Sequence, residues 1–280
     1  MVTGVLKADR FEIPYMVFGE GMRCLVCVNG MQQTMAAWRM VVRRLGARRQ
    51  YRIVLFDFPQ QGRARCSEER SSATVADQIA VLGTVIDAVS PSTPVALLGG
   101  SWGAVISAAY AALHPARVSR LVLGSFQARP NARLREVAQL GRELVEQDRM
   151  HEIAELFIRE FGTHLPAERR RALQTQFGAL GPEQFRQMYE TAAMLTSADD
   201  LDGIADLGAI EAQTLIVNGA ADPIVDAADP FTRQRIPSAE LCVVPGVGHF
   251  LHYERAEVLD VYAEFLHRPF EADFQLPAAV

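Results

Sequence analysis

The stretch Val95-Ala96-Leu97-Leu98-Gly99-Gly100-Ser101-Trp102-Gly103-Ala104 contains the pattern Gly-x-Ser-x-Gly between an apolar run and a helix-forming run. In this strand–turn–helix context the pattern places a serine hydroxyl on a sharp turn, where it is exposed as a nucleophile. Gly99 and Gly103 leave room where the backbones of strand and helix pass close together. The stretch therefore predicts Ser101 as a nucleophile at the N-terminus of a helix.

A serine hydroxyl is inert at neutral pH without a base, and the base is expected late in the chain, in the order Ser, Asp, His. An apolar run at 241–244 is followed by a glycine-containing loop that carries His249. Among the histidines His249 alone has this placement, and His252 is the main alternative.

The acid that orients the histidine is expected after the preceding strand. Asp222 lies in a short turn after the apolar run 214–217 and is the predicted partner of the histidine. Asp226 and Asp229 are nearby alternatives. Both lie where the next helix should begin, so helix capping explains them.

The remaining part of such a site is a pair of backbone N–H donors for an oxyanion. One donor is the amide after the nucleophile, that of Trp102. The other is expected from the loop after an early strand, Val28-Asn29-Gly30-Met31, at the Met31 amide. The Met31 side chain and Asn29 are expected to line a substrate pocket.

Short apolar runs alternate with amphipathic stretches, which indicates βαβ units and a parallel sheet buried on both faces. The expected strands are 11–18, 24–28, 53–56, 95–98, 121–124, 214–217 and 241–244. The expected helices are 35–45, 75–89, 102–113 and 258–266. The predicted fold class is α/β, with a mostly parallel central sheet flanked by helices.

Residues 128–207 contain no good strand and have the apolar periodicity of helices. We expect a helical cap there, a core made of 1–127 and 208–270, and a tail of little structure at 271–280. Apolar residues of the cap are candidates for the pocket wall, although packing between cap helices explains each of them equally well. They are Phe177, Leu180, Phe185, Met188, Met194 and Leu195.

The composition of the chain argues against several classes of function. The chain has 280 residues, 49% of them hydrophobic, and a net charge of −5, which argues against a nucleic-acid partner. Lys7 is the only lysine, so chemistry that needs an internal lysine motif is excluded. No apolar run is long enough for a membrane span and no secretory signal opens the chain, so a cytoplasmic location is expected. No nucleotide, flavin or metal motif occurs, and we expect neither a cofactor nor a metal.

Cys24 and Cys27 form a Cys-x-x-Cys pair that could indicate a redox or metal site. The pair lies in an expected strand, and residues three apart in a strand point to opposite faces. Both are therefore interpreted as core cysteines.

Together these segments resemble the α/β-hydrolase superfamily over nearly the whole chain. Several motifs are also similar to the hydroxyacyl transferase family of rhamnolipid biosynthesis. The oxyanion loop opens with Asn-Gly where most superfamily members have His-Gly, which costs no donor because the donors are backbone groups. The motifs are Val28-Asn29-Gly30, Leu55-Phe56-Asp57 with Pro59 and Gly62, Ser101-Trp102-Gly103, Val217-Asn218-Gly219 with Asp222, and Gly248-His249-Phe250-Leu251.

This resemblance implies an acyltransferase that joins two 3-hydroxyacyl chains into a 3-(3-hydroxyalkanoyloxy)alkanoic acid. Its donors would be hydroxyacyl thioesters of acyl carrier protein or coenzyme A. An acyl thioesterase or carboxylesterase with the same catalytic groups is the first alternative, and a non-catalytic ligand-binding receptor on this fold is the second. An arginine cluster could dock an acidic carrier or simply be solvated surface. It consists of Arg43, Arg44, Arg48 and Arg49.

Overall fold

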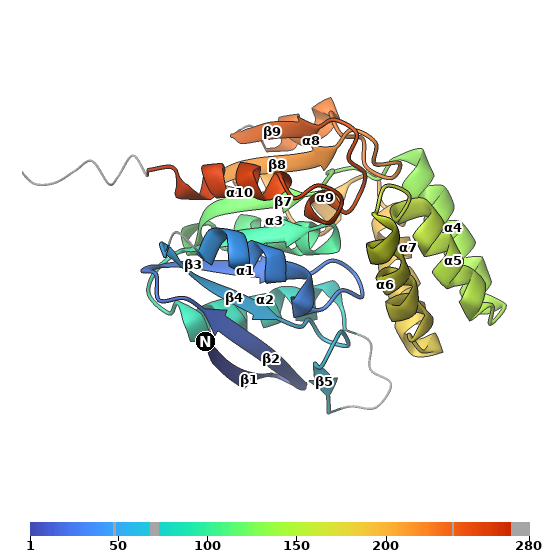
Figure 1. Cartoon of the computed structure of the whole chain (residues 1–280), viewed down its shortest axis with the longest axis horizontal. Coiled ribbons are helices and arrows are strands. Elements are labelled where there is room, and N and C mark those ends of the chain that lie inside the picture. Colours follow the sequence, from blue (N-terminus) through green and yellow to red (C-terminus); the bar gives the residue numbers. More distant parts are fainter. Residues whose placement is uncertain (47–48, 68–72, 237, 270–280) are drawn as a thin grey trace, which may run out of the picture.

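A computed structural model describes residues 1–46, 49–67, 73–236 and 238–269. Its centre is one sheet with the strand order β1-β2-β4-β3-β6-β7-β8-β9, in which β5 pairs with β2 (Figure 1). The strands from β4 to β9 along this order are parallel, and β1 and β2 are antiparallel to their neighbours. The strands are β1 Val2–Ala8, β2 Phe11–Phe18, β3 Arg23–Val28, β4 Tyr51–Phe56, β5 Arg65–Cys66, β6 Val95–Gly100, β7 Val118–Gly124, β8 Gln213–Gly219 and β9 Ala239–Val244.

The central strands are buried on both faces because helices cover the sheet from both sides. Two helices pack on one face with one apolar cluster, and two others pack on the opposite face with a second cluster. The first pair is α2 Val75–Val89 and α3 Trp102–Leu113, and the second pair is α1 Arg39–Gly46 and α10 Val258–His267. This arrangement confirms the predicted fold class.

Cys24 and Cys27 belong to opposite faces of the sheet, since each contributes to a different apolar cluster. Both thiols are free. Burial raises the pKa of Cys24 to about 11 and raises that of Cys27 as well. Neither cysteine is therefore placed to form a reactive pair.

Between β7 and β8 the chain forms four helices that lie together at one end of the sheet (Figure 1). We call this segment the helical insertion: α4 Ala132–Glu146, α5 Met150–Phe161, α6 Ala167–Gly178 and α7 Pro182–Ser197. It has its own apolar cluster, in which the rings of Phe157 and Phe177 stack with centroids 3.8 Å apart. Close packing of α4 on α7 requires Gly141, because a Cβ there would overlap the ring of Tyr189.

The remaining elements are short. They are the helices α8 Pro230–Arg235 and α9 Leu251–Glu254, and the 3-10 turns η1 Met35–Trp38, η2 Pro115–Arg117, η3 Leu201–Gly203 and η4 Leu207–Ala209. No helix in the described part of the chain is long and apolar enough to cross a membrane.

The structure places strands at all seven expected runs and adds two, β1 and β5. Residues of β1 alternate between exposed and half-buried, so this edge strand lacks the continuous apolar run of the central strands. The helix expected at 35–45 divides at Arg39 into η1 and α1. The tail expected at 271–280 lies outside the described residues.

Candidate active site

Ser101 occupies a strained turn between β6 and α3. Its φ of 53° lies in the left-handed region that L residues rarely adopt. The Ser101 N–H donates to the Gly124 carbonyl at 2.8 Å, which holds the turn against β7. A Cβ at Gly99 would lie 2.4 Å from the Gly103 carbonyl, and one at Gly103 would lie 2.2 Å from the Val28 carbonyl. Glycine is therefore required on both sides of the serine.

A chain of two hydrogen bonds links Ser101, His249 and Asp222. Nε2 of His249 lies 2.9 Å from Ser101 Oγ, and Nδ1 of His249 lies 2.7 Å from Asp222 Oδ2. The side chains of His249 and Asp222 are 5% and 0% exposed, so water competes little for these bonds. Ser101, Asp222 and His249 come from the carboxyl ends of β6, β8 and β9, which meet at one edge of a parallel sheet.

The alternative residues lie elsewhere. His252 is buried between the rings of Trp38 and Tyr253, with Nε2 3.5 Å from the Ala37 carbonyl. Burial lowers the pKa of His252 to about 4. Asp229 caps α8 by accepting from the backbone N–H groups of Phe231 and Thr232, as the capping interpretation predicts.

The loop that carries His249 is held on both sides. Glu254 accepts from the Gly248 N–H at 2.5 Å and from the Phe250 N–H at 2.9 Å, so one carboxylate binds the two amides that flank the histidine. The Ser125 hydroxyl donates to the His249 carbonyl at 2.7 Å. These bonds orient the imidazole toward the serine.

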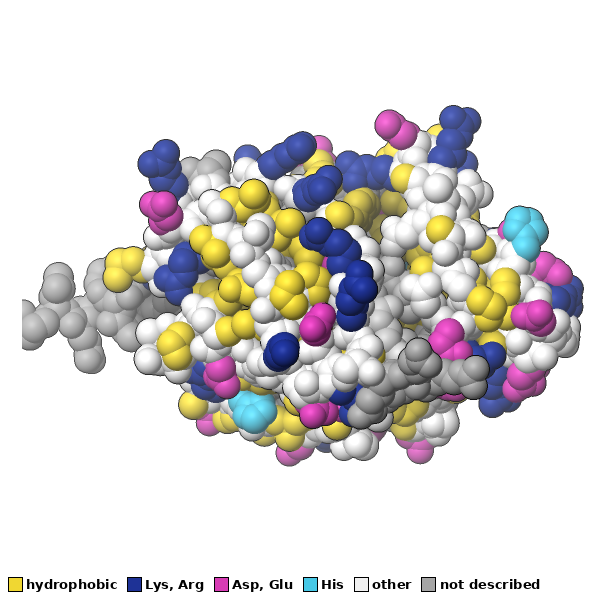
Figure 2. All heavy atoms as spheres, turned by 90° about the horizontal axis from the view of Figure 1, so that it is seen from below, with side chains coloured by type: hydrophobic (Ala, Val, Ile, Leu, Met, Phe, Trp, Pro, Cys, Tyr) yellow, Lys and Arg dark blue, Asp and Glu magenta, His cyan; other side chains and the backbone are white. Residues whose placement is uncertain are grey.

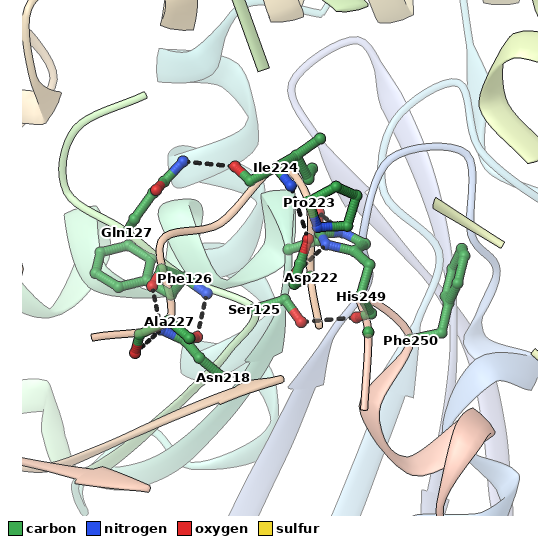
Figure 3. Close-up of polar contacts among 12 residues, drawn as sticks. Ser125, Phe126, Gln127, Asn218, Asp222, Pro223, Ile224, Ala227, His249 and Phe250 are labelled. Carbon is green, nitrogen blue, oxygen red and sulfur yellow. Dashed lines mark hydrogen bonds and ion pairs between the residues drawn. The ribbon is translucent and has the colours of Figure 1, made fainter. Parts of the chain in front are cut away.

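The loop that carries Asp222 is held by two amide side chains (Figure 3). Asn218 exchanges two hydrogen bonds of 2.9 Å with the backbone of Phe126. Gln127 donates to the Ile224 carbonyl at 2.7 Å and accepts from the Asp226 N–H at 2.9 Å. The carbonyl and NH2 groups of both side chains are hydrogen-bonded. These bonds connect the segment after β7 to the turn after β8 and hold that turn in place.

Both residues predicted to supply oxyanion donors line the same cavity as Ser101. Met31 lines the same cavity as Ser101, and Trp102 opens α3, where its N–H has no acceptor within the helix. Asn29 is fully buried: its Nδ2 donates to the Phe56 carbonyl at 2.9 Å, and its Oδ1 accepts from Trp38 Nε1 at 2.8 Å. Asn29 therefore holds the loop instead of lining a pocket.

A cavity of about 1030 Å³, including its open mouth, extends from Ser101 and His249 into the helical insertion. We call it the apolar cavity, because most of its wall is aliphatic and aromatic. Figure 2 shows a hollow with hydrophobic side chains between the two parts of the molecule. Met31, Met188 and Leu195 line the cavity. Phe161 lies against the His249 ring, with centroids 5.1 Å apart.

The other apolar residues expected in the pocket do not line this cavity. Phe177 and Phe185 are 0% and 1% exposed and pack inside the apolar cluster of the helical insertion. Leu180 packs against the same cluster, and Met194 is 38% exposed at the surface. Helical periodicity identifies an apolar face, but it does not distinguish a cavity wall from a helix–helix contact.

Sequence reasoning missed Ser125, Gln127 and Glu254. Ser125 and Gln127 bind backbone groups far away along the chain, so no local pattern indicates their roles. Glu254 binds amides only four and six residues before it, but the fold of that loop decides whether its carboxylate reaches them. The one available signal is position: Ser125 and Gln127 directly follow an expected strand end, the edge at which the other site residues lie. Among the described residues, no group of three or more His, Cys, Asp or Glu side chains could hold a metal ion.

The sequence matches the family described as "alpha/beta hydrolase fold" over residues 24–256. No curated protein matches it. Among solved structures it is similar to an esterase from Exiguobacterium antarcticum, with 18% identity, a TM-score of 0.80, and coverage of 95% of this chain and 100% of the esterase. A bromoperoxidase from Bacillus anthracis has 18% identity and a TM-score of 0.79, with the same two coverages.

An enol-lactonase from Burkholderia xenovorans also has 18% identity, with a TM-score of 0.75 over 95% of this chain and 100% of the lactonase. At this level of identity such likenesses show the fold alone. The family match, in contrast, spans most of the chain and includes every strand end that carries a site residue. The chain belongs to the α/β hydrolase family.

Proposed function

We propose that this chain is a serine-dependent acyl-transferring enzyme of the esterase type, with Ser101, His249 and Asp222 as its catalytic residues. The observation that carries the proposal is the hydrogen-bonded chain from Asp222 through His249 to Ser101, which opens into the apolar cavity. A receptor would need the cavity, but ligand binding does not require these hydrogen bonds between Asp222, His249 and Ser101.

In the first step, Ser101 Oγ attacks the carbonyl carbon of an ester or thioester and His249 Nε2 takes the serine proton. Asp222 holds the tautomer of His249 and stabilises the imidazolium that forms. The bond to the leaving alcohol or thiol breaks, and His249 returns the proton to the leaving group. The product is an acyl-enzyme on Ser101.

The negative charge that develops on the carbonyl oxygen needs donors that are already oriented. The backbone N–H groups of Trp102 and Met31 are proposed for this task. Removal of one such donor costs about 3–4 kcal/mol of transition-state stabilisation in enzymes of this type. Asn29 contributes indirectly, since its side chain ties the Met31 loop to β4 and η1.

The apolar cavity supports an acyl group with an aliphatic chain as the substrate. Its wall combines the core side of Met31 and Trp102 with Met188 and Leu195 from the helical insertion. We therefore propose that 128–207 acts as a cap over a core formed by 1–127 and 208–270. Burial of each methylene contributes about 0.8 kcal/mol to binding, so chain length is expected to govern affinity.

The finer proposal is transfer between 3-hydroxyacyl chains, as the resemblance of the motifs implies. The 3-hydroxyl of a second chain would replace water as the acceptor and yield a 3-(3-hydroxyalkanoyloxy)alkanoic acid. The donors would be thioesters of acyl carrier protein or coenzyme A, in the cytoplasm. A wall that is mainly apolar favours a second acyl chain over water as the occupant of this cavity, which supports transfer over hydrolysis. An acyl thioesterase or carboxylesterase is the alternative with the same acyl-enzyme.

Mass spectrometry of the products from 3-hydroxydecanoyl thioesters, with Ser101→Ala in parallel, tests both the acyl-enzyme proposal and the finer proposal of transfer to a second chain. An ester-linked dimer that is lost in the variant supports the transferase, and free 3-hydroxy acid alone supports the thioesterase. Labelling of the wild type by a fluorophosphonate, with Ser101→Ala as the unlabelled control, tests the nucleophile. A wild type that is neither labelled nor active on these thioesters or on p-nitrophenyl octanoate contradicts the proposal and favours the receptor.

A further inference from the structure

The turn at 30–33, between β3 and η1, carries the Met31 amide and is closed by its own hydrogen bonds. The Gln33 N–H donates to the Gly30 carbonyl at 3.2 Å, and the Gly30 N–H donates to Gln33 Oε1 at 3.1 Å. In the described part of the chain, no group accepts a hydrogen bond from the Met31 N–H. A free amide in the wall of the cavity that contains Ser101 suits the proposed oxyanion donor.

Gln32, the next residue of the turn, has a backbone conformation that glutamine rarely adopts. Its φ of 54° lies in the left-handed region, where glycine is favoured and other L residues are strained. The side chain is nevertheless well packed, since Gln32 is only 6% exposed. Contacts from outside the turn must therefore hold this residue in place, because the local preference of the backbone does not.

Those contacts come from the helical insertion. Gln176 Nε2 donates to the Gln32 carbonyl at 2.6 Å, and Gln32 Nε2 donates to the Gln184 carbonyl at 3.4 Å. We call these two hydrogen bonds the glutamine bridge. Gln176 lies in the last turn of α6 and Gln184 in the first turn of α7, so the bridge ties the turn at 30–33 to both helices. Met31 also packs against apolar clusters of both the sheet region and the insertion.

An oxyanion donor is effective only where it is already oriented, because a donor that has to move gives up part of the stabilisation of the transition state. The start of α3 fixes the Trp102 amide. The Met31 amide lies in a loop instead. Asn29 holds the start of this loop from the sheet region, and the glutamine bridge holds its tip from the insertion. Neither Gln32 nor Gln176 lines the apolar cavity, so the bridge acts on the loop and not on an acyl chain.

We propose that Gln32 and Gln176 are positioning residues through which the helical insertion orients the Met31 amide. The oxyanion site is then complete only while α6 and α7 are docked on the turn at 30–33. This inference rests on the proposed function. Loss of the bridge slows the steps that pass through an oxyanion and leaves binding of the acyl chain unchanged.

Gln176→Met tests the bridge, because methionine has nearly the length of glutamine but carries no donor. The kcat for p-nitrophenyl octanoate should fall about fivefold, the equivalent of one hydrogen bond, with KM within about twofold. Gln176→Lys restores a donor at this exposed position and should recover most of the loss. Gln174→Met is the matched control. Gln174 is exposed on the same helix and makes no hydrogen bond in the described residues, so kcat should stay within about twofold.

A thionoester separates an effect on the oxyanion from a general disturbance of the site. In p-nitrophenyl thionooctanoate sulfur replaces the carbonyl oxygen, and sulfur accepts hydrogen bonds only weakly. The ratio of the ester rate to the thionoester rate should therefore fall about fivefold in Gln176→Met. The butyrate and decanoate esters should lose kcat equally, because the bridge does not line the apolar cavity.

Gln32→Gly separates the bridge from the local conformation of the turn. Glycine favours the left-handed backbone but lacks the amide that donates to the Gln184 carbonyl. The kcat should fall about threefold although the turn is relaxed. A kcat equal to or above that of the wild type would show that the turn positions Met31 without the insertion. The melting temperature verifies that each variant is folded.

A kcat of Gln176→Met within twofold of that of Gln174→Met overturns the bridge proposal, and so does an equal fall of the ester and thionoester rates. In either case an active wild type leaves the proposed function in place. A wild type with neither a burst of p-nitrophenol nor fluorophosphonate labelling overturns the proposed function itself.

Discussion

The sheet edge and the helical insertion contribute to the same cavity by different forces. At the sheet edge, hydrogen bonds orient Ser101, His249 and Asp222, and further bonds from Glu254 and Gln127 hold their loops. In the helical insertion, a buried cluster of apolar residues sets the positions of the helices. Hydrogen bonds are directional, whereas apolar contacts depend mainly on volume. We therefore expect changes at the sheet edge to alter rate, and changes in the insertion to alter chain-length preference.

Asp222→Asn tests the sheet edge most directly. The amide can present its N–H to His249 Nδ1, which would stabilise the wrong tautomer, so kcat should fall by about 10³- to 10⁴-fold with little change in KM. Steady-state kinetics with p-nitrophenyl octanoate measures both. Asp229→Asn is the control: it alters a helix cap nearby and should leave kcat within about threefold. A comparable loss of kcat in both variants would argue against a catalytic role for Asp222.

His252, which is buried close to the candidate site, should make the stability of the protein depend on pH. Because burial lowers the pKa of His252 to about 4 from 6.5, the unfolded chain binds the additional proton between these values. Stability should therefore decrease as pH falls below about 6.5, by about 3 kcal/mol when pH reaches about 4. His252→Phe, which keeps a ring beside Trp38, should remove this part of the pH dependence in urea unfolding.

His151 provides the control for that measurement, since its side chain is 87% exposed. His151→Phe should leave the pH dependence of unfolding as it is in the wild type. An unchanged slope in His252→Phe would show that another group accounts for the loss of stability in acid.

Glu254→Gln tests the carboxylate that binds the amides on both sides of His249. The variant keeps one acceptor oxygen and turns an NH2 group toward the other amide, so one bond is lost. We expect kcat to fall about tenfold while KM stays within about twofold, since the group positions the base without touching substrate. Glu264→Gln, an exposed change on α10, should have no effect. A rise in KM at constant kcat would assign Glu254 to substrate binding instead.

Leu195→Trp tests the helical insertion and should have the smallest effect on rate. The larger side chain shortens the apolar cavity and so leaves less room for a long acyl chain than for a short one. The ratio of kcat/KM for p-nitrophenyl decanoate to kcat/KM for p-nitrophenyl butyrate should therefore fall about fivefold. Met194→Trp is the matched control, because Met194 adjoins Leu195 in the sequence but is exposed at the surface. If both variants shift chain-length preference equally, the cavity is not the acyl site.

Much of the sheet could be predicted because its strands are continuous apolar runs between turns. The Gly-x-Ser-x-Gly turn and the order of Asp222 and His249 along the chain follow from the same local reasoning. The edge strand β1 was not predicted, because most of its residues are exposed or half-buried and it lacks the continuous apolar run of the central strands. The cavity wall escaped prediction because Phe177 and Leu195 have the same chemical character, although one packs between helices and the other faces the cavity.

The alternation of strands and helices and the residues at the strand ends can be predicted from the sequence, because both depend on local patterns. Which side chains meet depends on how the elements pack. The hydrogen bonds of Ser125 and Gln127 to distant loops and the packing of α4 on α7 each depend on segments far apart in the chain. Such contacts form only when the elements pack, so no local pattern encodes them.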